Sequence, residues 1–429
     1  MAEEKPIPYY RRNLLAFTGD TVFFVLGLSF SDPVTVLPTF ARALGASAPL
    51  VGLISTLQSG GWLLPQLISA NFVASKERKK PYVVWPSLLN RPMYLAVAAV
   101  TYFFGATRPA LVLLAFYLCQ AIFWTCDGLA SVPWFDILGK AFPGRQRGRY
   151  LGISQVTGGV LAIGAGVLVR RVLDPTAGLP FPQNYSLLFL LTVAFFSLSL
   201  MSMSMIKEPI ESTHTERASW GRYLPMLAAT LRQDRVFRRV VAARLLAGFG
   251  GMAIPFYILY GTEGLGLGTG VVGLGLTLQI IGRILGGLLL GFGVEKMGNR
   301  FTILGGLGLT SLAPLLALAL GALGGSLLDR TLVLYLYPVI FFFMGVWVNT
   351  MMWGFTNYVL DIAPPKDRTT YVGLTNTIGG LLILAPMLGG AILQFTSYVA
   401  LFAVSLAIYM LAMGVSWRLP RGREVTEPF

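Results

Sequence analysis

The sequence has few of the residues on which most catalytic and metal sites depend. Its only histidine, His214, lies in a polar stretch, which excludes a histidine relay or a histidine-ligated metal within an apolar segment. Its two cysteines, Cys119 and Cys126, are one heptad apart in one predicted helix. They cannot form a disulfide there, because a disulfide requires Cα atoms within about 7 Å. We therefore expect no metal, no cofactor and no redox function.

Charge is also scarce. Only 12% of the residues are charged, about half the usual fraction for a soluble domain, and 55% are hydrophobic. The glycine-rich run Gly264–Gly268 has no nearby lysine to help bind phosphate, and no other nucleotide-binding loop is visible. We therefore do not predict an enzyme. The segment Met1–Asn13 lacks the apolar core and small-residue cleavage site of a signal peptide.

Long apolar runs fill the chain instead. A helix needs roughly 20 apolar residues to cross the bilayer core, and nothing shows the ten-residue alternation of a transmembrane β-barrel. The sequence thus predicts an all-α polytopic membrane protein with twelve transmembrane helices. The predicted spans are 13–43, 48–75, 81–104, 108–137, 148–172, 184–206, 237–262, 269–293, 301–323, 331–360, 370–394 and 397–417.

The basic residues are distributed unevenly between these spans. The net charge of +14 would suit nucleic acid, but most of the 33 Lys and Arg residues fall in the two tails and in alternate loops. This is the positive-inside pattern, and it predicts an inner (plasma) membrane protein with both termini in the cytoplasm and no nucleic-acid partner. Only five basic residues fall in the opposite loops: Arg42, Arg108, Arg170, Arg171 and Arg330.

The chain also contains an internal repeat. The motif V-G-L-x-x-T-L-Q begins at Val51 and returns at Val272, 221 positions later. At the same offset, the motif R-x-x-Y-x-G begins at Arg147 and at Arg368. Two matched blocks at one offset indicate duplication. Each copy holds six predicted spans, and an even number makes the two copies parallel repeats about an axis along the membrane normal.

Three regions follow from this duplication. We predict an N-terminal six-helix bundle over 1–206 and a C-terminal bundle with a short cytoplasmic tail over 237–429. Between them, 207–236 is a cytoplasmic linker. Within the linker, Trp220–Arg232 reads as an amphipathic helix at the membrane interface, with either a regulatory or a purely connecting role.

Two motifs resemble the major facilitator superfamily. The run G-F-G-V-E-K-M-G-N-R from Gly291 to Arg300 is similar to the loop signature G-x-x-x-D-R-x-G-R-R, with Glu295 in place of Asp. The run A-P-M-L-G-G from Ala385 resembles the core G-P-x-x-G-G of drug–proton antiporters, although here it lies in the eleventh span. The resemblance implies a secondary transporter in which two bundles rock to give alternating access.

The loop signature and its surroundings predict a cytoplasmic gate. Glycines permit a tight turn and close approach. We expect Glu295 to pair with Arg368 and Arg300 to pair with Asp361. Exposed pairs contribute only about 0–1 kcal/mol each, which suits a latch that opens repeatedly. The alternative is that these charges only set topology. The candidate gate residues are Gly291, Glu295, Gly298, Arg300, Asp361 and Arg368 in the second half, and Asp136 in the first half, with Arg145, Arg147 and the basic cluster 76–80 as its partners.

Ionisable residues at membrane depth are expensive, and they are functional candidates by default. The resemblance places the first, fourth, seventh and tenth spans around a central cavity, so three aspartates would face it. We expect at least one of them to couple transport to protons, with Arg91 as the competing cation; the alternative is a static Asp–Arg pair. The candidates are Asp20 and Asp32 on the first span, Arg91 on the third, Asp127 on the fourth, Arg244 on the seventh and Arg283 on the eighth.

Aromatic residues on the same spans suggest an apolar cavity wall, in which a few polar groups orient a ligand. We predict proton-coupled export of small lipophilic or amphipathic organic compounds, including drug-like ones, by a monomer in the lipid bilayer. The alternative is proton-coupled uptake of a nutrient such as a sugar or an organic anion. Besides the charges, the predicted cavity residues are Phe24, Trp124, Tyr257, Trp347 and Asn349.

Overall fold

The computed structural model of the protein describes residues 9–73, 76–142, 144–209, 230–324, 328–364 and 368–420. Apart from one isolated bridge between Gly324 and Leu328, the regular structure of these residues is helical. Ten described helices or helix runs are long and apolar enough to span a bilayer. The two remaining predicted spans correspond to α3 and α4, which have 26 and 24 residues. These features confirm the prediction of an all-α polytopic membrane protein.

The chain forms two compact units. The first unit comprises residues 1–32 and 57–218, and the second comprises 33–56 and 219–429. The units differ from the predicted bundles mainly in one segment, since 33–56 belongs to the second unit although it precedes most of the first. The predicted amphipathic helix at Trp220–Arg232 lies mainly outside the described residues.

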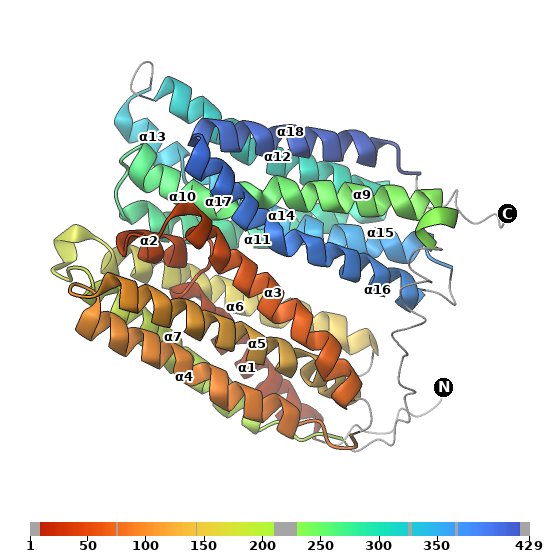
Figure 1. Ribbon diagram of the computed structural model, residues 1–429. Coiled ribbons are helices and arrows are strands. Elements are labelled where there is room, and N and C mark those ends of the chain that lie inside the picture. Colours follow the sequence, from red (N-terminus) through yellow and green to blue (C-terminus); the bar gives the residue numbers. More distant parts are fainter. Residues whose placement is uncertain are drawn as a thin grey trace. The chain divides into compact units, whose positions relative to one another are not determined.

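The first unit is a bundle of long helices. Figure 1 shows α4 lying beside α5 and α7, and α1 lying beside α6 and α7, in agreement with their contacts. Its helices are α1 (Tyr10–Phe30), the greater part of α3 (Ala48–Val73), α4 (Pro81–Phe104), α5 (Pro109–Ala141), α6 (Gly144–Val172), the 3₁₀ turn η1 (Pro175–Ala177) and α7 (Gln183–Ser204).

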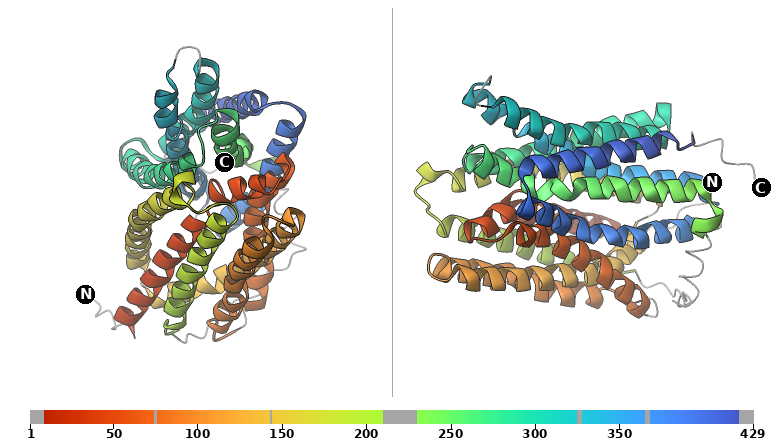
Figure 2. Two further views of the ribbon diagram at one scale, coloured as in Figure 1. Left: turned by 90° about the vertical axis from the view of Figure 1, so that its left-hand side faces the viewer. Right: turned by 45° about the horizontal axis from the view of Figure 1, so that its top comes forward.

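The second unit has more interrupted helices. Within it α11 packs against α12 and α14, and α18 packs against α9 and α12 (Figure 2). Its elements are α2 (Val36–Ala43), α9 (Arg235–Gly250), η2 (Gly251–Ala253), α10 (Ile254–Leu259), η3 (Tyr260–Gly264), α11 (Gly270–Met297), α12 (Asn299–Leu323), α13 (Arg330–Leu336), α14 (Val339–Asn349), η4 (Thr350–Gly354), α15 (Phe355–Ile362), α16 (Arg368–Gly379), η6 (Gly380–Leu384), α17 (Ala385–Phe395) and α18 (Tyr398–Trp417).

Several predicted spans are broken at recognisable positions. The span predicted over 13–43 ends as α1 at Phe30 and resumes as α2 at Val36, because Pro33 cannot continue the hydrogen-bonding ladder. Two other spans contain a π-helical turn, η3 and η4. Such turns are rare and often occur at functional sites, so η3 and η4 mark the seventh and tenth predicted spans as irregular.

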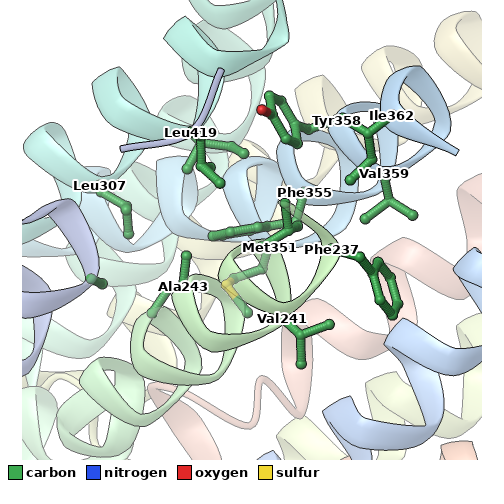
Figure 3. Close-up of a cluster of buried hydrophobic side chains, with 14 of the residues drawn as sticks. Phe237, Val241, Ala243, Leu307, Met351, Phe355, Tyr358, Val359, Ile362 and Leu419 are labelled. Carbon is green, nitrogen blue, oxygen red and sulfur yellow. The ribbon is translucent and has the colours of Figure 1, made fainter. Parts of the chain in front are cut away.

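Each unit has its own apolar core. In the first, the buried ring of Phe17 has three aromatic neighbours: Trp134 at 5.4 Å between centroids, Phe142 at 5.6 Å and Tyr150 at 6.1 Å. In the second, buried side chains from α9, α12, α15 and α18 meet around Phe355 (Figure 3). These cores hold the helices in fixed register, and so they position the polar residues described below.

Small residues bring segment 33–56 close to the rest of the second unit. A methyl group on Gly52 would clash with the carbonyl of Pro386, and Thr56 donates a hydrogen bond to the carbonyl of Ile383 at 2.8 Å. Arg42 forms an ion pair with Glu263, with 2.8 Å between Nε and Oε1. Close backbone approach through small residues is the usual way in which helices associate in lipid.

Candidate functional site

Asp20 lies in the interior of the first unit. Its side chain on α1 is buried and accepts two hydrogen bonds, from the Ser199 hydroxyl of α7 at 2.6 Å and from the Trp134 indole of α5 at 2.8 Å. Both are hydrogen bonds to a carboxyl group, and such bonds are stronger than neutral ones when the acceptor is ionised. Asp20 therefore connects three helices.

Arg91, on α4, lies between two aromatic rings. Its guanidinium carbon is 4.9 Å from the ring centre of Phe24 and 4.7 Å from that of Phe196. One terminal nitrogen donates to the Ser199 hydroxyl at 3.5 Å. In the described part of the chain, its Nε and Nη1 atoms are buried without a hydrogen-bond partner. Cation–π contacts of this kind strengthen when water is excluded.

Two carboxyl groups act electrostatically on this one cation without an ion-pair contact to it in the described part of the chain. Asp20 on α1 and Asp127 on α5 both interact electrostatically with the Arg91 guanidinium, and they repel each other. The three predicted charges Asp20, Arg91 and Asp127 thus come together in one unit. We call them, with Ser199 and Trp134, the Asp20–Arg91 cluster.

A second polar network adjoins the cluster. The Gln120 amide donates to the Tyr94 hydroxyl at 3.1 Å, and the Trp124 indole donates to the Gln120 carbonyl oxygen at 3.1 Å. Asp127 and Asp32 both act electrostatically on Tyr94. Asp32 itself is buried at the break after α1. Trp124 and Asp32, two predicted site residues, therefore lie near the same tyrosine.

The predicted site residues of the second unit lie in different surroundings. Tyr257 is buried and stacks on Phe402 with 4.7 Å between centroids, a position that favours a packing role. Trp347 is half-buried and donates to the carbonyl of Ala247 at 3.4 Å. Asn349, at the end of α14, donates to the backbone carbonyl of Arg283 at 2.7 Å, and the Arg283 side chain is exposed.

In the loop motif between α11 and α12, one glycine has the predicted role and the other does not. Gly298 adopts a positive φ of 77°, which glycine tolerates best, and it forms the tight turn between the helices. A side chain at Gly291 would meet nothing within 4 Å, so no close approach requires a glycine there. The side chains of Glu295 and Arg368 lie outside the description, and their predicted pairing stays a prediction.

Asp361 has a different partner from the one expected. The amide of Asn299 donates to its carboxyl group at 2.6 Å. Arg300 instead donates to the backbone carbonyl of Trp417 and lies over the indole, 5.7 Å from the ring centre. Asn299 and Arg300 are adjacent on α12 and therefore point in different directions. Asp361 consequently meets the amide of Asn299 and not the guanidinium of Arg300.

The first unit carries the corresponding ionic group at the end where α1 begins. Asp136 pairs with Lys79 at 2.9 Å and with Lys140 at 3.1 Å, and Lys140 is 3.5 Å from Glu208. The pairing with the basic cluster 76–80 was expected, whereas the side chain of the predicted partner Arg147 lies outside the description. We call Asp136, Lys79, Lys140 and Glu208 the Asp136 group.

The Asp136 group also fixes the end of α7. The Glu208 carboxyl accepts backbone hydrogen bonds from Lys79 and Lys80, each at 2.9 Å. The Lys80 ammonium donates to the carbonyl of Ile206 at 2.8 Å. Burial, with the nearby positive charges of Arg12 and Lys207, lowers the pKa of Lys80. The start of α4 and the end of α7 are therefore held together by charge and by hydrogen bonds.

The sequence matches the Major Facilitator Superfamily profile over residues 21–383 and over residues 240–428. This chain belongs to the major facilitator superfamily. The first match begins one residue after Asp20, and it covers the other four residues of the Asp20–Arg91 cluster and the loop motif in the second unit. Comparison with curated proteins gave no match.

Solved structures of transporters are similar to this chain over nearly its whole length. A POT family transporter in complex with a thioalcohol-conjugated peptide has a TM-score of 0.69 at 10% identity, covering 97% of each chain. A D-xylose–proton symporter has a TM-score of 0.68 at 16% identity, covering 97% of this chain and 99% of the other. The nucleoside transporter NupG has a TM-score of 0.65 at 16% identity, covering 94% and 98%. At sequence identities this low, the structural similarity shows a shared fold and nothing further.

Family and fold together indicate a membrane transporter and not an enzyme. They confirm the expected twelve-helix, two-domain architecture. They leave the substrate and the direction of transport as proposals, because the solved neighbours are transporters of unlike solutes.

Several residues of the site were not predicted. Ser199 and Trp134 bind Asp20, Phe196 stacks on Arg91, and Glu208 joins the Asp136 group. Serine and aromatic residues are so common in membrane helices that none of these positions stands out. Only Glu208 carried a signal, since it is an acid at the end of a span followed by Pro209.

Proposed function

We propose that this superfamily member exports small lipophilic or amphipathic organic compounds in exchange for protons. One observation supports the coupling: in the Asp20–Arg91 cluster, two carboxyl groups act electrostatically on a single buried guanidinium. With both carboxyl groups ionised, the cluster carries one uncompensated negative charge inside an apolar bundle, and such a charge is costly. Binding of one proton removes that charge, and release of the proton restores it.

The structure of the cluster supports a change of protonation coupled to movement. Its members come from α1, α4, α5 and α7, so a change in its charge acts on four helices at once. A substrate competes with the proton if both cannot be accommodated together. The repeat offset places Val241 and Val348 where the first half has Asp20 and Asp127, which assigns the coupling to the first unit.

We further propose how the protein is oriented in the membrane and which contacts form its cytoplasmic gate. The positive-inside distribution puts both termini in the cytoplasm of a cell with this protein in its inner membrane, and the protein acts as a monomer. The Asp136 group and the Asn299–Asp361 contact then lie on the cytoplasmic side. They would hold that face together in one state and separate in the other, as the two bundles rock.

Flux in proteoliposomes tests the proposal. We would load vesicles with naphthyltrimethylammonium or with naphthalenesulfonate, impose a pH gradient and follow the release of each probe. Wild-type protein should release at least one probe faster with the gradient than without it. Asp127→Asn and Asp20→Asn should lose this acceleration, whereas Asp329→Asn, which changes an exposed helix-capping carboxylate, should keep it.

Full pH dependence in Asp20→Asn, Asp32→Asn and Asp127→Asn would remove the proposal. The second candidate function is proton-coupled uptake of a nutrient such as a sugar or an organic anion. It is favoured by the similarity in fold to a D-xylose–proton symporter. Counterflow in vesicles of known orientation, with and without a pH gradient, separates the two. A symporter moves solute in the same direction as the protons, whereas a proton-exchanging exporter moves it in the opposite direction.

A further inference from the structure

The charges inside the second unit are all of one sign. Four arginines lie within its predicted spans: Arg238 and Arg239 at the very start of the seventh span, and Arg244 and Arg283 deeper in the seventh and eighth. The first unit balances Arg91 with aspartates, but no carboxyl group has a comparable position in the second half of the sequence. Every acidic residue after residue 219 falls outside the predicted spans: Asp234, Glu263, Glu295, Asp329, Asp361, Asp367, Glu424 and Glu427.

Arg244, on α9, is held by a neutral group. Both of its terminal nitrogens donate to the amide oxygen of Asn376 on α16, each at 3.2 Å. Its Nε atom is buried and has no hydrogen-bond partner in the described ranges, where the guanidinium also forms no ion pair. An amide oxygen orients a guanidinium but does not neutralise it, so the positive charge is uncompensated.

One side of this pair is open. Asn376 is exposed, although α16 belongs to a run that is long and apolar enough to span the bilayer. Facing lipid at that depth would cost an arginine and an asparagine several kcal/mol. The face that carries Arg244 and Asn376 is therefore one that water or a solute reaches.

An aromatic ring lies one to two helical turns away along α9 and η2. Trp347 donates its indole hydrogen to the backbone carbonyl of Ala247, which is three residues after Arg244 on α9. Trp347 is half-buried, so part of its ring is available for contact. A cation and an aromatic surface one to two turns apart match a molecule with a charged end and an apolar end.

We propose that Arg244 and Asn376 bind the anionic group of an amphipathic organic anion, whose apolar part lies against Trp347. A sulfonate, phosphate or carboxylate supplies oxygen acceptors that match the planar fork of a guanidinium, and it can occupy the unpartnered Nε. This inference rests on the proposed transport function and narrows its substrate class to anions. An anionic lipid headgroup offers the same chemistry, and the test separates the two sources.

Thermal stability of the purified, full-length protein in detergent tests the site. Naphthalenesulfonate is compared with the neutral naphthalenesulfonamide, which has nearly the same shape. Only the sulfonate should stabilise the wild-type protein. Hydrogen bonds to charged groups contribute about 1.5–3 kcal/mol, so its Kd should rise about tenfold or more in Arg244→Gln.

Asn376→Asp provides a sharper variant, because it leaves Arg244 in place and supplies an internal carboxylate. It should abolish sulfonate binding without unfolding the protein. The matched control is Arg239→Gln, which removes an exposed arginine five residues earlier on the same helix. The inference is overturned if sulfonate and sulfonamide stabilise the protein equally, or if neither sulfonate nor naphthyl phosphate stabilises it. It is also overturned if Arg244→Gln binds the sulfonate as tightly as the wild type. Arg244-dependent stabilisation by phosphatidylglycerol, without stabilisation by the sulfonate, would also overturn the inference, because the site would then bind a lipid headgroup.

The two proposals fail separately. If vesicles show gradient-driven flux of naphthyltrimethylammonium and the Arg244 variants bind sulfonate normally, the anion site is wrong and proton-coupled export stands. If no probe moves with the gradient but Arg244-dependent binding of sulfonate is found, the anion site stands and the coupling proposal is wrong.

Discussion

Removing the Asp20 carboxyl group should destabilise the first unit strongly. Asp20→Ala leaves the Ser199 hydroxyl and the Trp134 indole without their acceptor, and it takes one countercharge from Arg91. At about 1.5–3 kcal/mol for each hydrogen bond to a charged group, the two lost bonds amount to about 3–6 kcal/mol.

Asp20→Asn is the matched comparison. Its amide oxygen can accept from Trp134, and its amide nitrogen can donate to the oxygen of Ser199, so both contacts survive in neutral form. Neutral hydrogen bonds contribute only about 0.5–1.5 kcal/mol each, and the loss should therefore be about 2–3 kcal/mol. Ser199→Ala removes one contact alone and should fall between wild type and Asp20→Ala.

The assay is reversible unfolding of the purified protein by sodium dodecyl sulfate, followed by circular dichroism. The expected order of unfolding free energy is wild type, then Asp20→Asn, then Asp20→Ala. If Asp20→Ala lies within about 1 kcal/mol of wild type, the hydrogen bonds of Asp20 do not hold these helices together. The same result would also remove the structural basis for transmitting its charge to α5 and α7.

Three further predictions concern packing and the ionic contacts. Gly282→Ala, whose methyl group would clash with the backbone of α14, should lose about 1–3 kcal/mol in unfolding assays, whereas Gly291→Ala on the same helix should lose none. The Arg42–Glu263 pair, in which the side chains are 40% and 37% exposed, should show a coupling energy of at most about 1 kcal/mol in a double-mutant cycle. Glu208→Gln should cost about 1–3 kcal/mol, measured by thermal unfolding, because the buried carboxylate accepts two backbone N–H groups and faces Lys140.

Hydrophobic runs were sufficient to predict the helices. The length rule for crossing a bilayer depends only on composition along the chain, so each predicted span corresponds to helix in the structure. The break between α1 and α2 was also foreseeable, since Pro33 acts locally. The π-helical turns η3 and η4 were not, because they depend on how neighbouring helices pack against the turn.

Charge in apolar surroundings was an equally good guide to part of the site. Asp20, Arg91 and Asp127 were singled out because such residues are expensive in membranes, and the structure brings them together. Their neutral partners were missed, since the rotation of each helix about its axis decides which serine or tryptophan meets a carboxyl group. The same dependence on rotation gave Asp361 to Asn299 instead of Arg300.

The contact between Trp134 and Asp20 has an optical consequence. An indole that donates its hydrogen to a carboxylate emits differently from one that faces a neutral acid, because the nearby charge shifts the excited state. The protein therefore contains its own reporter of proton binding, in a position where no dye needs to be attached. If the remaining tryptophans are replaced by phenylalanine, the emission of Trp134 becomes a direct spectroscopic record of when the cluster gains and loses its proton.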